Sequence, residues 1–132
     1  MFQLTPEEQA GLDRAMGETL TFTVPRDQAI VSWDRAHEFV DRYSTMKLRN
    51  FTDSLLVTYD TPTYQSVPTP DPGSGIRFGY SIRRASGAEG IQVQVECTAS
   101  SKLGENDASK NAHLAALYVR TGQLGCERCI VR

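Results

Sequence analysis

Two stretches in which every second residue is apolar constrain the fold more than any other feature. The first covers residues 76–83 and the second covers residues 91–98. Alternation with a period of two is typical of β-strands that bury one face and expose the other. Turn-forming residues at positions 86–89 separate the two stretches. This combination predicts an antiparallel β-hairpin.

The alternation also predicts how the two hairpin strands pair. Both apolar sets lie on one face if Ile82 pairs with Val93 and Tyr80 pairs with Val95. A slip of one residue would turn a whole apolar set toward water. The opposite face is then polar. We expect it to present Arg77, Arg83, Arg84, Gln92, Gln94 and Glu96.

Two helices are predicted before the hairpin. Thr5, Pro6 and Glu8 form the capping signature of a helix that runs from residue 6 to about residue 16. In residues 26–43 the apolar side chains recur at helical spacing. We expect the inward-facing set of this second helix to be Ala29, Ile30, Trp33, Ala36, His37 and Val40.

Two further strands and a last helix complete the secondary structure. Residues 20–24 alternate between apolar and polar side chains, and residues 55–59 form a short apolar run, so both stretches predict strands. Asn106 or Asp107 caps a final helix, and Gly122 is placed to end it.

This order of elements, α-β-α-β-β-β-α, predicts one α+β domain over residues 1–132. Because each strand has one polar face, we expect an antiparallel sheet of about four strands with helices packed on one face only. In its order of elements this arrangement resembles the plan of cystatin-like and helix-grip-like domains. Residues 60–75 form a long loop rich in proline and glycine, and residues 123–132 form an irregular C-terminal tail.

Composition narrows the choice of partner and compartment. The net charge is -2, so we expect no binding to nucleic acid. No apolar run approaches the roughly 20 residues of a membrane span, and the first residues lack a signal peptide, so we expect no membrane and a cytoplasmic protein. Nucleotide-binding and zinc-protease motifs are also missing from the sequence, and we expect no cofactor. A protein partner or self-association stays open.

The three cysteines are Cys97, Cys126 and Cys129, and their odd number argues against a disulfide framework. Cys126 and Cys129 form a C-x-x-C pair, which is a candidate for zinc binding or redox chemistry. Two thiols supply only half of a usual zinc site, and the pair follows a helix instead of opening one. The simpler interpretation is two cysteines without such a role.

The candidate for small-ligand binding is a pocket between helix 26–43 and the sheet, lined by Trp33, His37, Tyr59 and Tyr80. On the same helix, His37 and Asp41 are weak candidates for catalytic residues, since a carboxylate one helical turn away can orient an imidazole for proton transfer. His37 also fits the role of a boundary residue with one satisfied hydrogen bond, and no partner nucleophile is visible in the sequence.

Three surfaces are candidates for binding a partner. They are the polar face of the sheet, the loop of residues 60–75 with Tyr64, and an exposed sheet edge formed by the strand at 20–24 or at 55–59. Because catalytic signatures are missing, a non-enzymatic binding or assembly domain is the leading hypothesis. The alternatives are a small-ligand or enzymatic domain and a zinc- or redox-dependent tail.

Overall fold

The computed structural model describes residues 3–59 and 76–132, and predictions for residues 60–75 lie outside them. In chain order the described elements are α1 (Pro6–Met16), β1 (Thr21–Val24), α2 (Ala29–Tyr43), β2 (Leu48–Phe51), β3 (Leu55–Thr58), β4 (Phe78–Ser86), β5 (Ile91–Ala99) and α3 (Glu105–Thr121). Short 3₁₀ turns occupy Arg26–Gln28, Lys102–Gly104 and Glu127–Cys129.

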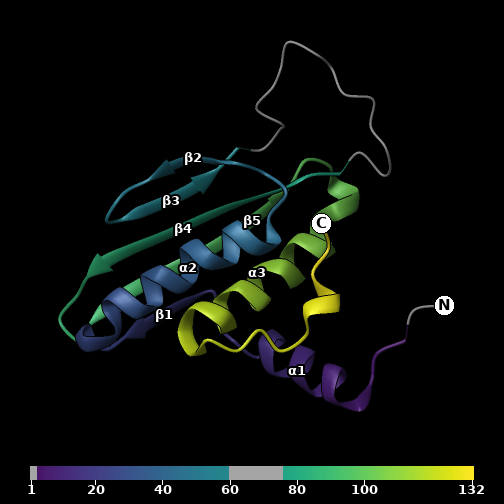
Figure 1. The fold of residues 1–132 in the computed structure, drawn as a ribbon, viewed down its shortest axis with the longest axis horizontal. Coiled ribbons are helices and arrows are strands. Elements are labelled where there is room, and N and C mark those ends of the chain that lie inside the picture. The colour runs from purple at the N-terminus through teal and green to yellow at the C-terminus, as the bar shows by residue number, and fades with distance from the viewer. Residues whose placement is uncertain (1–2, 60–75) are drawn as a thin grey trace, which may run out of the picture.

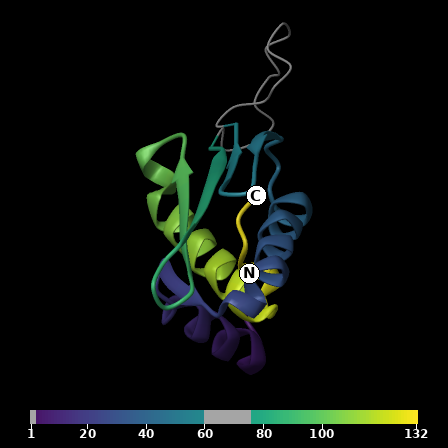
Figure 2. The ribbon, with the colours of Figure 1, turned by 90° about the vertical axis from the view of Figure 1, so that its left-hand side faces the viewer.

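The strands form one antiparallel sheet in the order β1-β5-β4-β3-β2. Helices α2 and α3 lie across one face of the sheet, and α1 packs against α3 (Figures 1 and 2). The core fills the space between the helices and the sheet. Its largest fully buried side chains are Phe39, Leu56, Ile82, Leu114 and Leu117. The predicted α+β class, with helices packed on one face, is confirmed.

The sheet has five strands where about four were expected, because β2 was not predicted. Its sequence, Leu-Arg-Asn-Phe, lacks alternation, and three of its four side chains are exposed. It pairs with β3, and the pairing shifts register between Leu48 and Asn50. The strand at 55–59, proposed as an exposed edge, is therefore internal, whereas β1 is an edge strand as expected.

The β4–β5 hairpin is confirmed, but its register differs from the prediction by two residues. Ile82 pairs with Val95, and Tyr80 pairs with Cys97. Both strands extend to the turn, so that Ser86 pairs with Ile91 and only residues 87–90 form the loop. A shift of two residues keeps the alternating apolar and polar sets of both strands on their predicted faces. Alternation alone therefore cannot distinguish the two registers.

The buried side of α2 is rotated relative to the predicted one. The exposed fraction of Ile30 is 75%, whereas Phe39 is fully buried and Tyr43 is 8% exposed. The predicted helix at 26–43 opens with a 3₁₀ turn, and α2 itself begins at Ala29. Its buried residues are Ser32, Trp33, Ala36, Phe39, Val40 and Tyr43, which recur at helical spacing.

The helix ends agree in part with the capping signals. The capping box of Thr5 and Glu8 is present at the start of α1. Gly122 ends α3 in the left-handed conformation, with φ of 81°. The start of α3 differs from the prediction, because the helix begins at Glu105 after the 3₁₀ turn and not after Asn106 or Asp107.

The C-terminal tail has one 3₁₀ turn and otherwise no regular structure, yet it is packed into the protein. The side-chain amide of buried Asn111 donates to the carbonyl of Val131 at 2.8 Å and accepts from its N–H at 3.0 Å. Cys126 and Ile130 are buried in the same cluster as the core of the sheet. The tail therefore completes the core beside α3.

Candidate functional site

Trp33 and His37 lie one turn apart on α2 and pack against β2. The indole N–H of Trp33 donates to the carbonyl of Thr52 at 3.0 Å. Phe51 stacks on Trp33 with ring centroids 6.1 Å apart and lies 4.7 Å from the ring of His37. The Arg84 guanidinium lies over the Trp33 ring, 4.6 Å from its centroid. Each of these contacts joins α2 to the sheet.

The other residues proposed for a ligand pocket lie elsewhere. Tyr80 is 2% exposed and packs edge-on against Phe39, and burial raises the pKa of its hydroxyl. Tyr59 follows β3 and is 38% exposed. Asp41 is exposed and, among the residues that the structure describes, shares no hydrogen bond with His37. The structure therefore does not bring together the four residues proposed to line a pocket, Trp33, His37, Tyr59 and Tyr80.

Cys126 and Cys129 are joined by a disulfide and are 2% and 3% exposed. The 3₁₀ turn at Glu127–Cys129 brings their Cα atoms to 5.3 Å. This is a local link within the tail, not a framework between distant segments. Over residues 3–59 and 76–132 the structure has no group of three or more His, Cys, Asp or Glu side chains suited to hold a metal ion.

The polar face of the sheet carries an open groove of about 610 Å³ near the hairpin turn. The pairing places Thr21, Gln94, Arg83 and Leu55 in one row across four strands on this face. Arg84, predicted to share the polar face, lies on the helix side instead. Its side chain donates to the carbonyls of Asp53 and Ala29. The row therefore holds a single cation.

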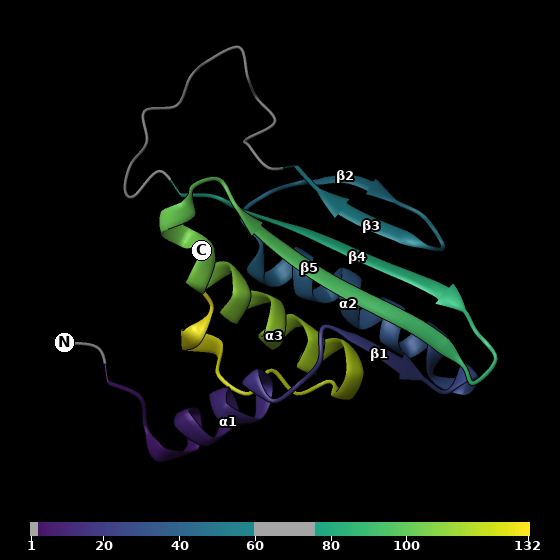
Figure 3. The same ribbon diagram turned by 180° about the vertical axis from the view of Figure 1, so that it is seen from behind.

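The most distinctive surface is the C-terminal half of β5, because the flanking strand β1 is shorter than β5 and does not reach it. β5 has nine residues, and the four residues of β1 pair only with Ile91 to Gln94. The last bond on this side runs from the N–H of Val95 to the carbonyl of Leu20 at 2.8 Å. Beyond it, residues 96–99 have β4 on one side and, within residues 3–59 and 76–132, no strand on the other (Figure 3).

The backbone of this half-strand presents unused hydrogen-bonding groups. Successive residues of an antiparallel strand direct their N–H and C=O groups to alternate neighbours. Val95 bonds toward β1, so Cys97 and Ala99 point the same way, and Glu96 and Thr98 point toward β4. In the described part of the chain no hydrogen bond reaches the backbone N–H of Cys97 or Ala99. We call residues 96–99 the open edge.

A groove of about 360 Å³ lies between the open edge and the first half of α3. Small side chains form much of its lining, namely Ala99, Ala108, Ser109 and Ala112. Leu103 stands close to the groove and is 88% exposed, in the 3₁₀ turn whose Gly104 packs on Ala99. A backbone edge thus lies beside a shallow, mainly apolar depression.

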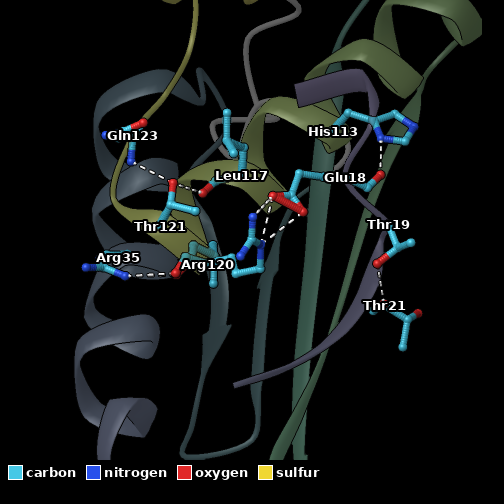
Figure 4. A network of polar contacts seen from close by, with 10 residues as sticks. Glu18, Thr19, Thr21, Arg35, His113, Leu117, Arg120, Thr121 and Gln123 are labelled. Carbon is cyan, nitrogen blue, oxygen red and sulfur yellow. Dashed lines mark hydrogen bonds and ion pairs between the residues drawn. The ribbon is translucent and has the colours of Figure 1, made fainter. Parts of the chain in front are cut away.

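The end of the groove near Leu20 is held in place by a polar network (Figure 4). The imidazole of His113 on α3 bonds to the backbone carbonyl of Glu18 through Nδ1 at 2.9 Å. The Glu18 carboxylate accepts from Nε of Arg120 at 2.8 Å. Arg35 on α2 donates to the carbonyl of Arg120 at 3.2 Å. The segment that leads into β1 is therefore tied to α3, which fixes this end of the groove.

The groove is acidic. Glu96 and Glu105 line it, and no Lys or Arg is among the lining residues in the described part of the chain. Both glutamates are exposed, and neither forms an ion pair with any residue that the structure describes. The sequence analysis placed Glu96 on the polar face but did not single out Glu105. That both residues line one groove depends on the packing of α3 beside β5.

The open edge was also missed from the sequence, although one signal pointed to it. The alternating stretch at 20–24 is shorter than the stretch at 91–98, so a flanking strand formed by the first cannot cover the whole of the second. That comparison requires knowing that β1 pairs with β5. Nothing in the local sequence of either strand specifies this pairing.

Comparison with known proteins gives no match to the chain among protein-family models, curated proteins or solved structures. Among residues 3–59 and 76–132, no helix has the length and apolar character needed to cross a membrane. Geometry is therefore the basis for assigning a function.

Proposed function

We propose that this chain is a non-enzymatic binding domain that captures an extended segment of a partner protein on the open edge of β5. The observation that carries the proposal is the pair of outward-pointing backbone amides at Cys97 and Ala99, which lie beside a groove. Adding a strand to such an edge is a common mode of peptide recognition, in which main-chain bonds supply affinity and side-chain pockets supply specificity.

The geometry suits this role in two respects. A strand added at residues 96–99 bonds to the N–H and C=O groups of Cys97 and Ala99, four groups in all. At about 0.5–1.5 kcal/mol net for each hydrogen bond, the pairing contributes about 2–6 kcal/mol before the cost of ordering the peptide. The groove toward α3 then receives the side chain that alternates onto the helix side.

The opposite edge of the sheet is less suited to strand addition. β2 is four residues long and its register shifts between Leu48 and Asn50. Irregularities of this kind interrupt the regular spacing of backbone groups that an added strand needs, and short or bulged edges are a usual protection against unwanted pairing. The open edge of β5, in contrast, continues the regular ladder between β4 and β5.

The proposal is tested by selecting binders from a library of random heptapeptides and mapping them by backbone amide hydrogen exchange in NMR spectra. In the free protein we expect the amides of Cys97 and Ala99 to exchange rapidly, and those of Glu96 and Thr98 to be protected by β4. A bound peptide should slow exchange at Cys97 and Ala99 specifically.

Proline substitution provides the matched variants. Ala99→Pro removes an outward N–H without removing a bond to β4, and should abolish peptide binding. Ser86→Pro is the control, because its N–H also points away from β5 but lies at the far end of β4. Failure to select any peptide that protects Cys97 and Ala99, or binding that survives Ala99→Pro, would contradict the proposal.

A further inference from the structure

The structure assigns a charge to the captured segment: we infer that it is cationic, with a Lys or Arg side chain next to an apolar one. This inference rests on the proposed function and specifies the class of partner. Two independent features of the groove support it, namely the placement of its carboxylates and the small side chains on its helix side.

The two glutamates border the groove from different elements. Glu96 belongs to the strand, on the polar side of the sheet, whereas Glu105 is the first residue of α3. A strand laid between them places successive side chains alternately on the polar side and on the helix side. A basic side chain on the polar side therefore stands beside Glu96, and opposite charges on neighbouring strands attract.

The adjacent side chain of the bound segment points toward α3. There it meets Ala108 and Ala112, which are 4% and 2% exposed and present only methyl groups, with Leu20 beside them. These three residues favour an apolar side chain, and Ser109 is the one hydroxyl that α3 adds to the described lining. Glu105 at the rim provides a second contact for a basic residue further along the segment.

A second copy of this chain is a poorer occupant. If two open edges paired about a two-fold axis, each would present the same surface to the other. The glutamates of both copies would then lie at the same interface, and among the described residues that line the groove there is no Lys or Arg to offset them. Like charges facing each other across paired strands are destabilising. The charge of the groove thus selects a partner of opposite charge.

The test uses three synthetic peptides in which valine alternates with lysine, with glutamate or with glutamine. Affinity is measured by calorimetry at low and physiological salt, and the site is mapped by amide exchange at Cys97 and Ala99. We expect the lysine peptide to bind the native chain about ten-fold more tightly than the glutamine peptide at low salt, and this preference to shrink as salt is added.

Charge reversal gives the decisive comparison. The double variant Glu96→Lys/Glu105→Lys should lose about ten-fold in affinity for the lysine peptide and should prefer the glutamate peptide. Glu89→Lys is the control, since Glu89 is exposed at the hairpin turn, at the other end of β5. It should leave the preference of the native chain unchanged.

The outcomes separate the two proposals. If all three peptides bind equally and protect Cys97 and Ala99, the open edge captures strands but the cationic preference is wrong. A stronger binding of the glutamate peptide to the native chain would also overturn it. If no peptide protects these amides at millimolar concentration, both proposals fail. Both fail equally if the amides are already protected in a dimer of the free chain.

Discussion

Replacing Asn111 by alanine should release the C-terminal tail from the core. The Asn111 side chain is fully buried on α3, and its two polar atoms bond to the N–H and C=O of Val131. The side chain therefore takes the place of a neighbouring strand, because it bonds to the N–H and C=O groups of Val131, which lies outside any helix or strand. Among the described residues no buried side-chain polar atom is left without a partner, and Asn111 is one reason.

The expected loss of stability follows from these two bonds. Each net hydrogen bond contributes about 0.5–1.5 kcal/mol, and a buried group left unpaired costs about 1–3 kcal/mol. Val131 is half-buried, so water partly replaces the lost partner. We expect Asn111→Ala to lower the free energy of unfolding by about 2–4 kcal/mol. With an unfolding entropy of about 2.1 cal/mol/K per residue, this lowers Tm by roughly 7–14 °C for 132 residues.

The assay is urea and thermal unfolding followed by circular dichroism. Asn106→Ala is the control, because Asn106 is exposed in the first turn of the same helix. Asn111→Asp is the informative variant: it retains an acceptor for the Val131 N–H, but at neutral pH it places a carboxylate against the Val131 carbonyl. It should therefore be as destabilising as alanine at pH 7 and recover partly in acid. A loss below about 1 kcal/mol for Asn111→Ala would refute the assigned role.

Three further predictions concern other contacts. Gly11→Ala would drive a methyl group into the backbone oxygen of Gly125, so the urea midpoint should fall by the equivalent of about 1–3 kcal/mol. An unchanged midpoint would show that α1 can move away. The Arg128 guanidinium lowers the pKa of Glu8 from 4.5 to about 2, so Arg128→Gln should return it toward 4.5 in an NMR titration, and the pair's stabilisation should be complete above pH 4.5 and lost as the pH falls toward 2. Burial raises the pKa of Cys97 from 9.0 to about 12, so iodoacetamide should modify it at pH 8 roughly a thousand-fold more slowly than in the denatured chain, whereas comparable rates would show an accessible thiol.

Local patterns predicted the elements that depend on local physics. The capping box at Thr5 and the left-handed glycine at Gly122 satisfy helix ends with groups that are close in sequence. The alternation in β4 and β5 correctly assigned each side chain of the hairpin core to its face. These features need no information about distant residues, and so the α+β class could be predicted.

The errors arose where two solutions have the same local pattern. A hairpin register shifted by two residues keeps the same faces, so the pairing of Ile82 with Val95 depends on the length of the turn and on the packing behind it. The predicted buried face of α2 differs from the observed one because Ile30 was assigned to the core as an apolar residue, yet it is 75% exposed. Strand β2 escaped prediction because a mostly exposed edge strand needs no apolar alternation.

The candidate site shows the same difference between what local patterns predict and what long-range packing decides. The sequence by itself determined that β5 is a regular strand with Glu96 on its polar face, since alternation is a local property. Only the tertiary structure decided that a shorter β1 covers half of that strand, that α3 brings Glu105 to the same groove, and that Asn111 holds the tail beside the core. Each of these contacts joins residues far apart in the chain, and long-range packing, not local propensity, selects such contacts.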